Sequence, residues 1–452
     1  MCGINLCPAD RDISRMNEAI SHRGLPGRSG TWSNSVFSIG HVRLPILGLS
    51  DTYDQPFQSK GAVMAFAGEI FNFQNFDPYA LCDTPILMNM YRESGPTALR
   101  YLDGFWSFIY YDRSRPTRVE VVTDDLAKKP LYVHLPTLSV SSEIRALAIL
   151  DDLKELDPLY FSSVAKWGYH VGDRTYLKNV RKLPASTVTT IDYSSMTMQH
   201  HPWGGLAPDP SVNLREAITK AVNLRMLADV PVSLLLSGGL DSSIIFKLMV
   251  EKTTDFTVFH VDNEESEFLN YLNIPSKVRV EKIGFDDLDL ATVLRANEGP
   301  VDLGSMLPQY ALGQAIKKRN PEAKVIITGD GADELFGGYR RMSEYDAQYS
   351  DIFEELVMYH LPRLDKMSMA HTLQLRSPFL SRPVIQKALS IPYELRKNKM
   401  ALKVTFIDLI PTPIIQREKH PLKSKQVLYN PKWRHELIGK FKEVVHEHKR
   451  RG

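Results

Sequence analysis

Several classes of protein are excluded by what this chain of 452 residues lacks. It has only three cysteines, Cys2, Cys7 and Cys82, which are too few for a disulfide framework and do not have the spacing of a zinc site. No apolar run approaches the ~18 residues of a membrane-spanning helix, and "MCGINLCPADR" lacks the basic and apolar regions of a signal peptide. We therefore expect a cytoplasmic protein with no membrane partner.

The chain also lacks an excess of charge, internal repeats and low-complexity tracts. Lys+Arg 55 against Asp+Glu 53 gives a formal net charge of +2, which argues against a nucleic-acid partner. The 43% hydrophobic and 24% charged residues are typical of a globular protein, and the length exceeds what one hydrophobic core usually serves. Two folded domains are therefore expected.

The pattern of the sequence changes near residue 200. Residues 1–200 are rich in short alternating or apolar runs separated by glycine, proline and aspartate, which predicts strands joined by turns with a few flanking helices. Residues 201–213 are rich in proline and glycine and predict a linker. In residues 214–452, strands alternate with helices, which predicts an α/β domain with a parallel sheet, followed by a mostly helical C-terminal part.

A phosphate-binding loop is predicted at "LLLSGGLDSS" (234–243), where a buried strand would run through a glycine turn into a helix. Backbone N–H groups of glycines and a helix N-terminus attract an anion, and an aspartate there can hold Mg²⁺ on the phosphates. The simpler alternative is an ordinary strand–turn–helix connection with a serine N-cap. The loop is not a Walker A motif, but it resembles the pyrophosphate loop of ATP pyrophosphatases.

A second acidic turn follows another predicted strand in "VIITGDGADELFGGY" (325–339). Ligands of parallel sheets bind at the carboxyl ends of the strands, so the two loops are expected to share one Mg²⁺–ATP site. A solvated acidic turn is the alternative. Asp241 and Asp333 are the predicted metal ligands. The predicted ATP-binding residues are Leu235, Ser237, Gly238, Gly239, Leu240, Asp241, Ser242, Ser243 and Gly329.

Cys2 is a candidate nucleophile, because removal of Met1 would place its thiol beside its own α-amino group, which can accept the thiol proton. For "MC" alone, a small apolar residue at the start of a buried strand is the simpler interpretation. The stretches "HRGLPGRSG" (22–30), "GHVRLPILG" (40–48), "AGEIFN" (67–72) and "CDTPIL" (82–87) favour the nucleophile. Together with Cys2 they resemble class II glutamine amidotransferases, in which an N-terminal cysteine attacks the glutamine side-chain amide.

This resemblance implies an α+β N-terminal-nucleophile fold of stacked antiparallel sheets with flanking helices. It also implies Cys2 as nucleophile and four glutamine-binding residues: Arg43 for the α-carboxylate, Gly68 as oxyanion donor, and Glu69 and Asp83 for the α-amino end. Where the family usually has an asparagine, this chain has Ala67. One lost oxyanion donor is worth ~2.7–4 kcal/mol in a comparable site. A slow glutaminase, a substituted donor and a vestigial site that relies on free ammonia therefore stay open.

Over nearly the whole chain the motifs resemble glutamine-hydrolysing asparagine synthetases. The likeness continues through "YHLPRLDKMSMAHTLQLRSPFLSRPV" (359–384) and "NKMALKVTFIDLIPTPIIQREKHP" (398–421). It implies that Lys399 steadies the charge of the adenylate and pyrophosphate, and that Asp330 manages the proton of ammonia.

The implied function is glutamine-dependent conversion of aspartate to asparagine with Mg-ATP, giving AMP and pyrophosphate. Residues 298–310, where the family shapes its acceptor pocket, follow the pattern only loosely. Two alternatives therefore stay open: the same mechanism on another carboxylate (a sugar acid, a peptide or a β-lactam precursor), and a non-catalytic nucleotide or glutamine sensor. The expected partners are glutamine, ATP and the acceptor acid, with a homodimer as an open alternative.

Overall fold

Two antiparallel sheets form the N-terminal part of the computed structural model, which describes residues 2–59, 61–151, 153, 155–262, 264–339, 354–417 and 432–451. The strand order of the first sheet is β10-β8-β9-β1-β3-β2, and that of the second is β12-β11-β7-β6-β5-β4. The strands of the first sheet are β1 (Gly3–Pro8), β2 (Ser29–Ser33), β3 (Phe37–Val42), β8 (Tyr132–His134), β9 (Ser139–Ser141) and β10 (Val180–Lys182). Those of the second are β4 (Phe57–Ser59), β5 (Ala62–Ile70), β6 (Gly104–Asp112), β7 (Arg118–Thr123), β11 (Thr187–Asp192) and β12 (Thr197–Pro202).

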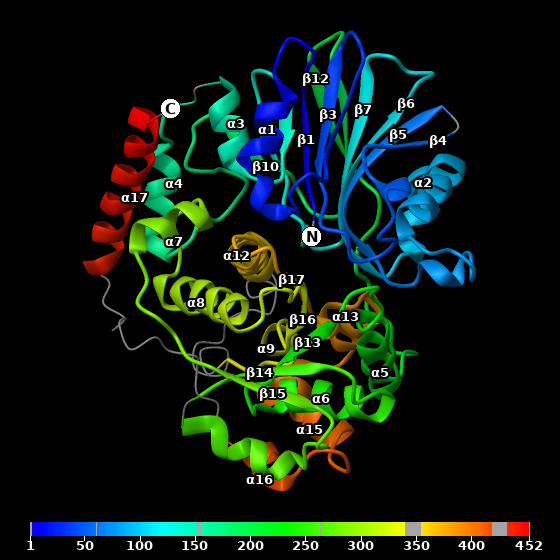
Figure 1. The fold of residues 1–452 in the computed structure, drawn as a ribbon, viewed down its shortest axis with the longest axis vertical. Coiled ribbons are helices and arrows are strands. Elements are labelled where there is room, and N and C mark those ends of the chain that lie inside the picture. The colour runs from blue at the N-terminus through cyan, green and yellow to red at the C-terminus, as the bar shows by residue number, and fades with distance from the viewer. Residues whose placement is uncertain are drawn as a thin grey trace.

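The two sheets stack face to face, because alternate apolar residues of both point into one shared core. Ile4 and Ile39 of the first sheet and Val63 and Ile109 of the second belong to this core, and all four are fully buried. Helices flank the sandwich (Figure 1). They are α1 (Ile13–Ala19), α2 (Asp83–Ser94), α3 (Ile144–Asp151) and α4 (Pro158–Trp167), with the short turns η1 (Ser21–Arg23), η2 (Asp51–Tyr53), η3 (Phe73–Asn75) and η4 (Gly95–Tyr101). The predicted α+β sandwich is confirmed.

A five-stranded parallel sheet forms the second part, in the order β15-β14-β13-β16-β17. Its strands are β13 (Val232–Leu235), β14 (Thr257–Val261), β15 (Arg279–Ile283), β16 (Val325–Ile327) and β17 (Gln374–Arg376). The helices are α5 (Leu214–Arg225), α6 (Leu240–Lys252), α7 (Leu290–Asn297), α8 (Leu303–Arg319), α9 (Ala332–Leu335), α12 (Leu361–Met369), α13 (Arg382–Ser390), α14 (Tyr393–Arg396), α15 (Met400–Thr405), α16 (Thr412–Gln416) and α17 (Lys432–Arg451). Shorter turns are η5 (Glu264–Leu272), η6 (Leu356–His360), η7 (Pro378–Leu380) and η8 (Lys397–Lys399).

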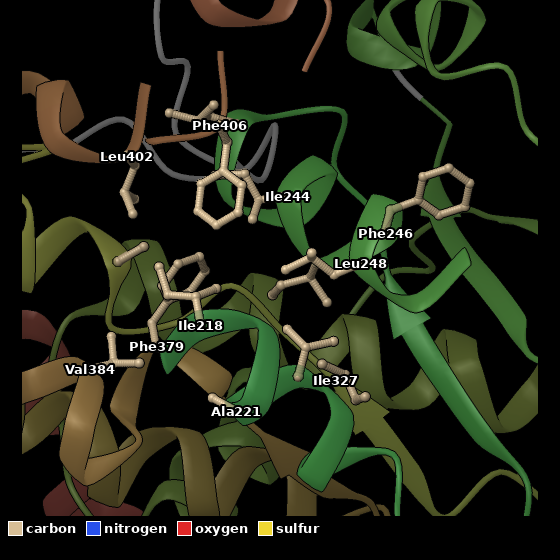
Figure 2. Close-up of a cluster of buried hydrophobic side chains, with 14 of the residues drawn as sticks. Ile218, Ala221, Ile244, Phe246, Leu248, Ile327, Phe379, Val384, Leu402 and Phe406 are labelled. Carbon is tan, nitrogen blue, oxygen red and sulfur yellow. The ribbon is translucent and has the colours of Figure 1, made fainter. Parts of the chain in front are cut away.

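The core of the second part lies between this sheet and the helices that cover it. Figure 2 shows Ile244 and Leu248 of α6, Ile327 of β16 and Phe406, which directly follows α15, among the side chains of this cluster. Elements that are far apart in the sequence therefore share one hydrophobic cluster. This packing fixes the loops that leave the carboxyl ends of β13 and β16.

Three details differ from the sequence-based expectation. β13 ends at Leu235, although Leu236 continues the apolar run of the predicted strand. β12 runs to Pro202, two residues into the predicted linker, and α5 begins at Leu214, immediately after it. The C-terminal part is mostly helical as predicted, but it also supplies the unpredicted strand β17, the fifth strand of the parallel sheet.

The two parts are held together by α12 and by α17 (Figure 1). α17 contacts α4 of the N-terminal part and α7 of the second part. Buried ion pairs cross the same boundary: Arg23 to Asp365 at 2.8 Å, Arg225 to Asp103 at 2.8 Å, and Arg376 to Glu69. In the described residues, no helix has both the length and the apolar character to cross a membrane.

Arg376→Met is expected to lower the free energy of unfolding by about 3–5 kcal/mol, because it leaves the buried Glu69 carboxylate without its cation. A matched control is Arg215→Met, whose pair with Asp408 is exposed on both sides and which should cost less than about 1 kcal/mol. Urea unfolding of the two variants measures the difference. Equal shifts of the unfolding midpoint would contradict the importance of the buried pair.

Candidate active sites

Cys2 lies at the start of β1, near the middle of the first sheet, and is 8% exposed. It packs in the cluster between the two sheets, which also contains Ala67 of β5. Its backbone carbonyl accepts a hydrogen bond of 3.2 Å from Nε of Arg23. The other side of the Arg23 guanidinium donates to Asp365 of α12 at 2.8 Å. The position of the candidate nucleophile is therefore tied to the second part of the chain.

Arg43 directly follows β3 and is almost completely buried. Its Nη1 donates to Asp54 at 2.6 Å, and four acceptors in all fix the guanidinium. The other three are the carbonyl oxygens of Ser50, Leu47 and Gly48. The loop after β3 thus wraps around the arginine and sets the orientation in which it can pair with a carboxylate.

Gly68 lies in β5 with a φ of +146°, and a Cβ there would lie 2.2 Å from the carbonyl oxygen of Phe105. Only glycine fits this position, as expected for a strand that bends beside a site. Asp83 begins α2 and accepts a hydrogen bond of 2.9 Å from the backbone N–H of Ile70. Burial, reinforced by the nearby charge of Glu69, raises the pKa of Asp83 to about 7. Asp83 is thus a carboxyl group that changes charge near neutral pH.

Glu69 is paired with a residue of the second part. It is buried and forms an ion pair with Arg376 of β17. Burial raises the pKa of Glu69, although the Arg376 guanidinium opposes that rise. Arg376 also donates to the carbonyl oxygens of Arg225 and Leu227. Glu69 is therefore already balanced by a cation, whereas Asp83 beside it has no ion pair with any described residue.

The serine-rich loop after β13 has the geometry of an anion site. Gly238 adopts a φ of +74°, and α6 begins at Leu240 with Gly239 as its N-cap residue. Ser242 Oγ lies 3.2 Å from the backbone N of Ser237, and Ser237 Oγ accepts from the N–H of Gly239 at 3.3 Å. The two hydroxyls thus hold the turn in shape at the helix N-terminus.

The loop after β16 meets this turn, because β13 and β16 are neighbours in the parallel sheet. A Cβ at Gly329 would lie 3.0 Å from Cβ of Asp241, so glycine allows the two loops to touch. Lys399 Nζ lies 2.5 Å from Asp241 Oδ2 and 2.7 Å from Asp333 Oδ1. Burial alone would lower the pKa of Lys399, but Asp241 and Asp333 together raise it. The structure thus brings together three residues that the sequence places up to 158 positions apart.

Asp330 lies in the same loop after β16, three residues before Asp333. Its Oδ2 accepts a hydrogen bond of 2.5 Å from the Thr328 hydroxyl, and Thr328 Oγ1 lies 3.5 Å from Ser377 Oγ. Burial raises the pKa of Asp330, with Glu334 acting in the same direction and the bond from Thr328 opposing it. A carboxyl group with a raised pKa is suited to proton transfer near neutral pH.

The donor set of Asp241 and Asp333 fits Mg²⁺, which proteins bind through one or two carboxylates while substrate phosphates complete its coordination. Among the described residues, no group of three or more histidine, cysteine, aspartate or glutamate side chains could hold a metal ion without further ligands. The residues present therefore suit an ion that binds together with the nucleotide phosphates.

Some contact residues were not predicted from the sequence. Arg376 contacts Glu69, Thr328 contacts Asp330, and the Arg417 guanidinium lies 4.0 Å from a Cβ built at Gly239. An isolated arginine or threonine carries no pattern that reveals a buried partner. Thr328, Arg376 and Arg417 all lie in stretches that carry the family resemblance, but nothing in those stretches indicates which residue each one contacts.

A small cavity lies between the two sites, at the boundary of the two parts of the chain. Its volume is about 40 Å³, and residues of both parts line it, among them Lys128, Lys129, Asp365 and Ser377. Asp365 accepts a hydrogen bond from Arg23, which also donates to the carbonyl oxygen of Cys2. Ser377 lies beside Thr328, whose hydroxyl donates to Asp330. Lys129 Nζ donates to Asp365 at 2.8 Å across the boundary.

Comparisons with known proteins agree with this arrangement. A family model described as "Glutamine amidotransferase domain" matches residues 1–203, and one described as "Asparagine synthase" matches residues 213–353 and 341–448. The nodule asparagine synthetase [glutamine-hydrolyzing] of Pisum sativum is 24% identical over 96% of this chain and 77% of its own length. Asparagine synthetase B [glutamine-hydrolyzing] of Escherichia coli (strain K12) is 25% identical over 90% of this chain and 77% of its own.

A protein with a different name has a comparable sequence identity over a shorter alignment. "Amidase chry2" of Gibberella zeae is 26% identical over 71% of this chain and 54% of its own length. A solved structure, the allosteric regulatory enzyme of purine biosynthesis, aligns over 78% of each chain with 12% identity and a TM-score of 0.33, which is too low to support a conclusion. The family matches cover both halves of the fold described above. The chain belongs to the asparagine synthase family of ligases, with a glutamine amidotransferase domain ahead of its synthase domain.

Proposed function

We propose that this protein is a glutamine-dependent asparagine synthetase that transfers ammonia from glutamine to the side-chain carboxylate of aspartate with Mg-ATP. The observation that carries the proposal is the meeting of Asp241 and Asp333, from two separate strand-end loops, at Lys399. Such a cluster of opposite charges at the carboxyl edge of a parallel sheet suits a polyphosphate and its cation. The proposed division is a glutaminase domain (1–200), a linker (201–213) and a synthetase domain (214–452).

In the synthetase domain, the loop Ser237–Ser243 holds the departing pyrophosphate through backbone N–H groups and the N-terminus of α6. Leu235, Leu240 and Gly329 border the same nucleotide site. Asp241 and Asp333 would hold Mg²⁺, which when bound neutralises phosphate charge. An oxygen of the acceptor carboxylate bonds to the α phosphorus, the bond to the β phosphate breaks, and pyrophosphate leaves with the electron pair. When Asp241 and Asp333 hold Mg²⁺, they no longer neutralise Lys399. Its ammonium group then balances the negative charge of the adenylate and the departing pyrophosphate.

In the glutaminase domain, the Cys2 thiolate attacks the side-chain carbonyl of glutamine, with Gly68 as the backbone donor to the oxyanion. Ammonia leaves, and water hydrolyses the thioester to glutamate. Arg43 receives the α-carboxylate. Because Glu69 is paired with Arg376, Asp83 is the carboxylate that remains for the α-ammonium group.

The cavity beside Asp365 is the proposed route of ammonia between the sites. Ammonia reaches the acyl-adenylate, its nitrogen bonds to the acyl carbon, Asp330 accepts the proton, and AMP leaves. A route inside the protein keeps ammonia from taking up a proton from bulk water. The raised pKa of Asp330 supports its role as the proton acceptor.

A different acceptor carboxylate is the second candidate, and two observations favour it. Ala67 removes one expected oxyanion donor, and a relative of comparable sequence identity is named an amidase. In addition, Glu298 of the loosely matching segment 298–310 bonds the backbone N–H groups of Ile144 and Arg145 and is not free to contact an acceptor. A non-catalytic sensor is disfavoured by the retention of Cys2 and Lys399.

Pyrophosphate release from Mg-ATP, measured with a panel of carboxylic acids and either glutamine or ammonium, tests the proposal. Release with aspartate alone, with asparagine identified by mass, supports the first candidate. Release with another acid transfers the assignment to the second. No release with any acid supports the sensor and contradicts the ligase.

Ala67→Asn is expected to raise glutaminase turnover by up to about 10²-fold, because it restores the family's amide donor next to Gly68, in the buried cluster that contains Cys2. Ala65→Asn is the matched control, since Ala65 lies two residues away in the same strand and cluster. Steady-state release of glutamate measures both variants. An unchanged rate in a folded Ala67→Asn variant would mean that another group already serves as the donor.

The KM for glutamine is expected to rise as the pH falls below about 7, by up to about tenfold per pH unit. The reason is that the Asp83 carboxyl takes up a proton there and loses the charge that attracts the α-ammonium group. Glutaminase kinetics on either side of pH 7 measure the effect. In Asp83→Asn the KM should be high and should lose this pH dependence; the same profile in that variant would assign the titration to another group.

A further inference from the structure

A second cavity, of about 70 Å³, lies between the two parts of the chain and belongs to neither site described above. One wall comes from the glutaminase domain, between Tyr132 and Lys182. The other comes from the loop after α7, from η6 and from α12. None of the predicted glutamine, ATP or metal residues lines it. The cavity has room for a few atoms of a small ligand beside the water that such a space would hold.

The polar groups that line this cavity are mainly hydrogen-bond donors. Lys182 Nζ, at the end of β10, donates to the carbonyl oxygen of Val357 and has no carboxylate partner among the described residues. The phenols of Tyr160 and Tyr176 have no hydrogen-bond partner there either. His170 packs against the Tyr160 ring, with centroids 5.5 Å apart, and both of its ring nitrogens are buried and unpartnered in the described structure.

Among the described residues of the cavity wall, Glu298 supplies the one carboxylate, and both of its oxygens already have partners. It accepts hydrogen bonds from the backbone N–H of Ile144 at 3.0 Å and from the N–H of Arg145 at 2.7 Å. It also forms an ion pair of 3.0 Å with Lys366. The carboxylate of the wall is thus used, whereas the Lys182 ammonium and the two phenols still have N–H and O–H groups to donate, so an acceptor group of a ligand fits them.

The charges of the wall leave one cation without a counter-charge. Three of its four cationic side chains have a carboxylate within 3.0 Å: Arg174 with Asp157, Arg363 with Asp302, and Lys366 with Glu298. Lys182 is the fourth. Burial, with the nearby charge of Lys366, lowers the pKa of Lys182 to about 7. A buried lysine of this kind gains when an anion shares its surroundings.

We propose that this cavity binds a small monocarboxylate, with its oxygens at Lys182 Nζ and at the phenols of Tyr160 and Tyr176. A single uncompensated cation matches one negative charge and not the two of phosphate. Ile144, Val301 and Met358 supply apolar wall for a short carbon chain. The ligand would bridge β10 of the glutaminase domain and α12 of the synthetase domain.

Such a ligand reaches the synthetase site through α12. Arg363 of that helix lines the cavity, and its charge acts on Asp330. Asp365, two residues further along the helix, forms ion pairs with Arg23 and Lys129. On the proposed function, a ligand bound here would contact both sides of the boundary between the two half-reactions. We assign the site to an effector and not to the acceptor acid, because none of Asp241, Asp333 and Lys399 lines it, although residues of segment 298–310 do.

Calorimetric titration of the full chain with sodium acetate and sodium propionate, without ATP or glutamine, tests the proposal. Saturable binding in the millimolar range is expected, as the size of these ligands allows. Lys182→Met should weaken it by about tenfold or more, and Tyr160→Phe with Tyr176→Phe by about tenfold together. Lys178→Met, four residues away and exposed, should leave it unchanged.

Arg43→Lys distinguishes binding in this cavity from binding at the glutamine site. The variant should not alter the affinity for acetate. The absence of saturable binding, equal binding by Lys182→Met, or tighter binding of phosphate than of either carboxylate would each overturn the proposal. So would loss of binding in Arg43→Lys alone. If Lys182→Met does not fold, as judged by thermal melting, the double tyrosine variant decides the matter by the same measurement.

Discussion

Cys2→Ala is expected to abolish glutamine-dependent synthesis, by about 10⁴-fold or more, and to spare synthesis from ammonium. The thiol is the group that forms the covalent bond to glutamine, and alanine at the start of β1 fits the same buried position. The synthetase site is built from other strands and other loops. Pyrophosphate release with aspartate, using glutamine in one assay and ammonium in the other, measures the two activities.

Cys7→Ala is the matched control for this experiment, because Cys7 is a second buried cysteine and lies in β1, the strand that directly follows Cys2. It should retain both activities, apart from any loss of stability caused by the smaller side chain. Equal loss of both nitrogen sources in Cys2→Ala would contradict the separation into two sites. Retention of glutamine-dependent synthesis would remove Cys2 from the role of nucleophile.

Asp241→Asn is expected to eliminate AMP formation with either nitrogen source, by on the order of 10³-fold, which corresponds to about 4 kcal/mol of barrier. Asparagine lacks the charge that Mg²⁺ requires and that now balances Lys399 at 2.5 Å. Glutamine hydrolysis at Cys2 should continue. Quantification of AMP and of glutamate in the same reaction separates the two effects.

The exposed Asp286, which pairs with Lys318 at the surface, provides the control variant Asp286→Asn. It removes one carboxylate charge from the same domain and should leave AMP formation unchanged. Turnover that survives in Asp241→Asn would exclude this residue from the metal site. If Asp241→Asn does not fold, as judged by thermal melting, Asp333→Asn tests the metal site instead, because it removes the other carboxylate.

The local structure of both loops follows from the order of residues in the chain. Apolar residues 232–236 predict a buried strand, Gly238 permits the left-handed turn, and the serines and Asp241 begin a helix. α2 covers "DTPILMNMYRES" (83–94), a stretch whose apolar residues have helical spacing. These predictions succeed because strand, turn and helix start depend on neighbours within a few positions.

β17 could not be predicted in this way. Its three residues, Gln374–Arg376, are too few for a periodic signal, and the polar Gln374 and Arg376 are buried whereas the apolar Leu375 is only half-buried. The strand exists because its backbone pairs with β16 and because the buried Arg376 finds Glu69 in the other domain, 307 positions away. The family resemblance likewise implies that Glu69 binds glutamine, but in the fold Glu69 already forms an ion pair with Arg376.

The order of residues by itself determined the two-part architecture, the strand-to-helix loops and the candidate groups, because each is a short-range pattern of size, polarity and glycine. Only the tertiary structure decided which charges meet: Lys399 with Asp241 and Asp333, Arg376 with Glu69, and Lys182 with no carboxylate among the described residues. The physical reason is that electrostatic energy depends on distance in space and on burial, and both are set by packing between elements that are far apart along the chain.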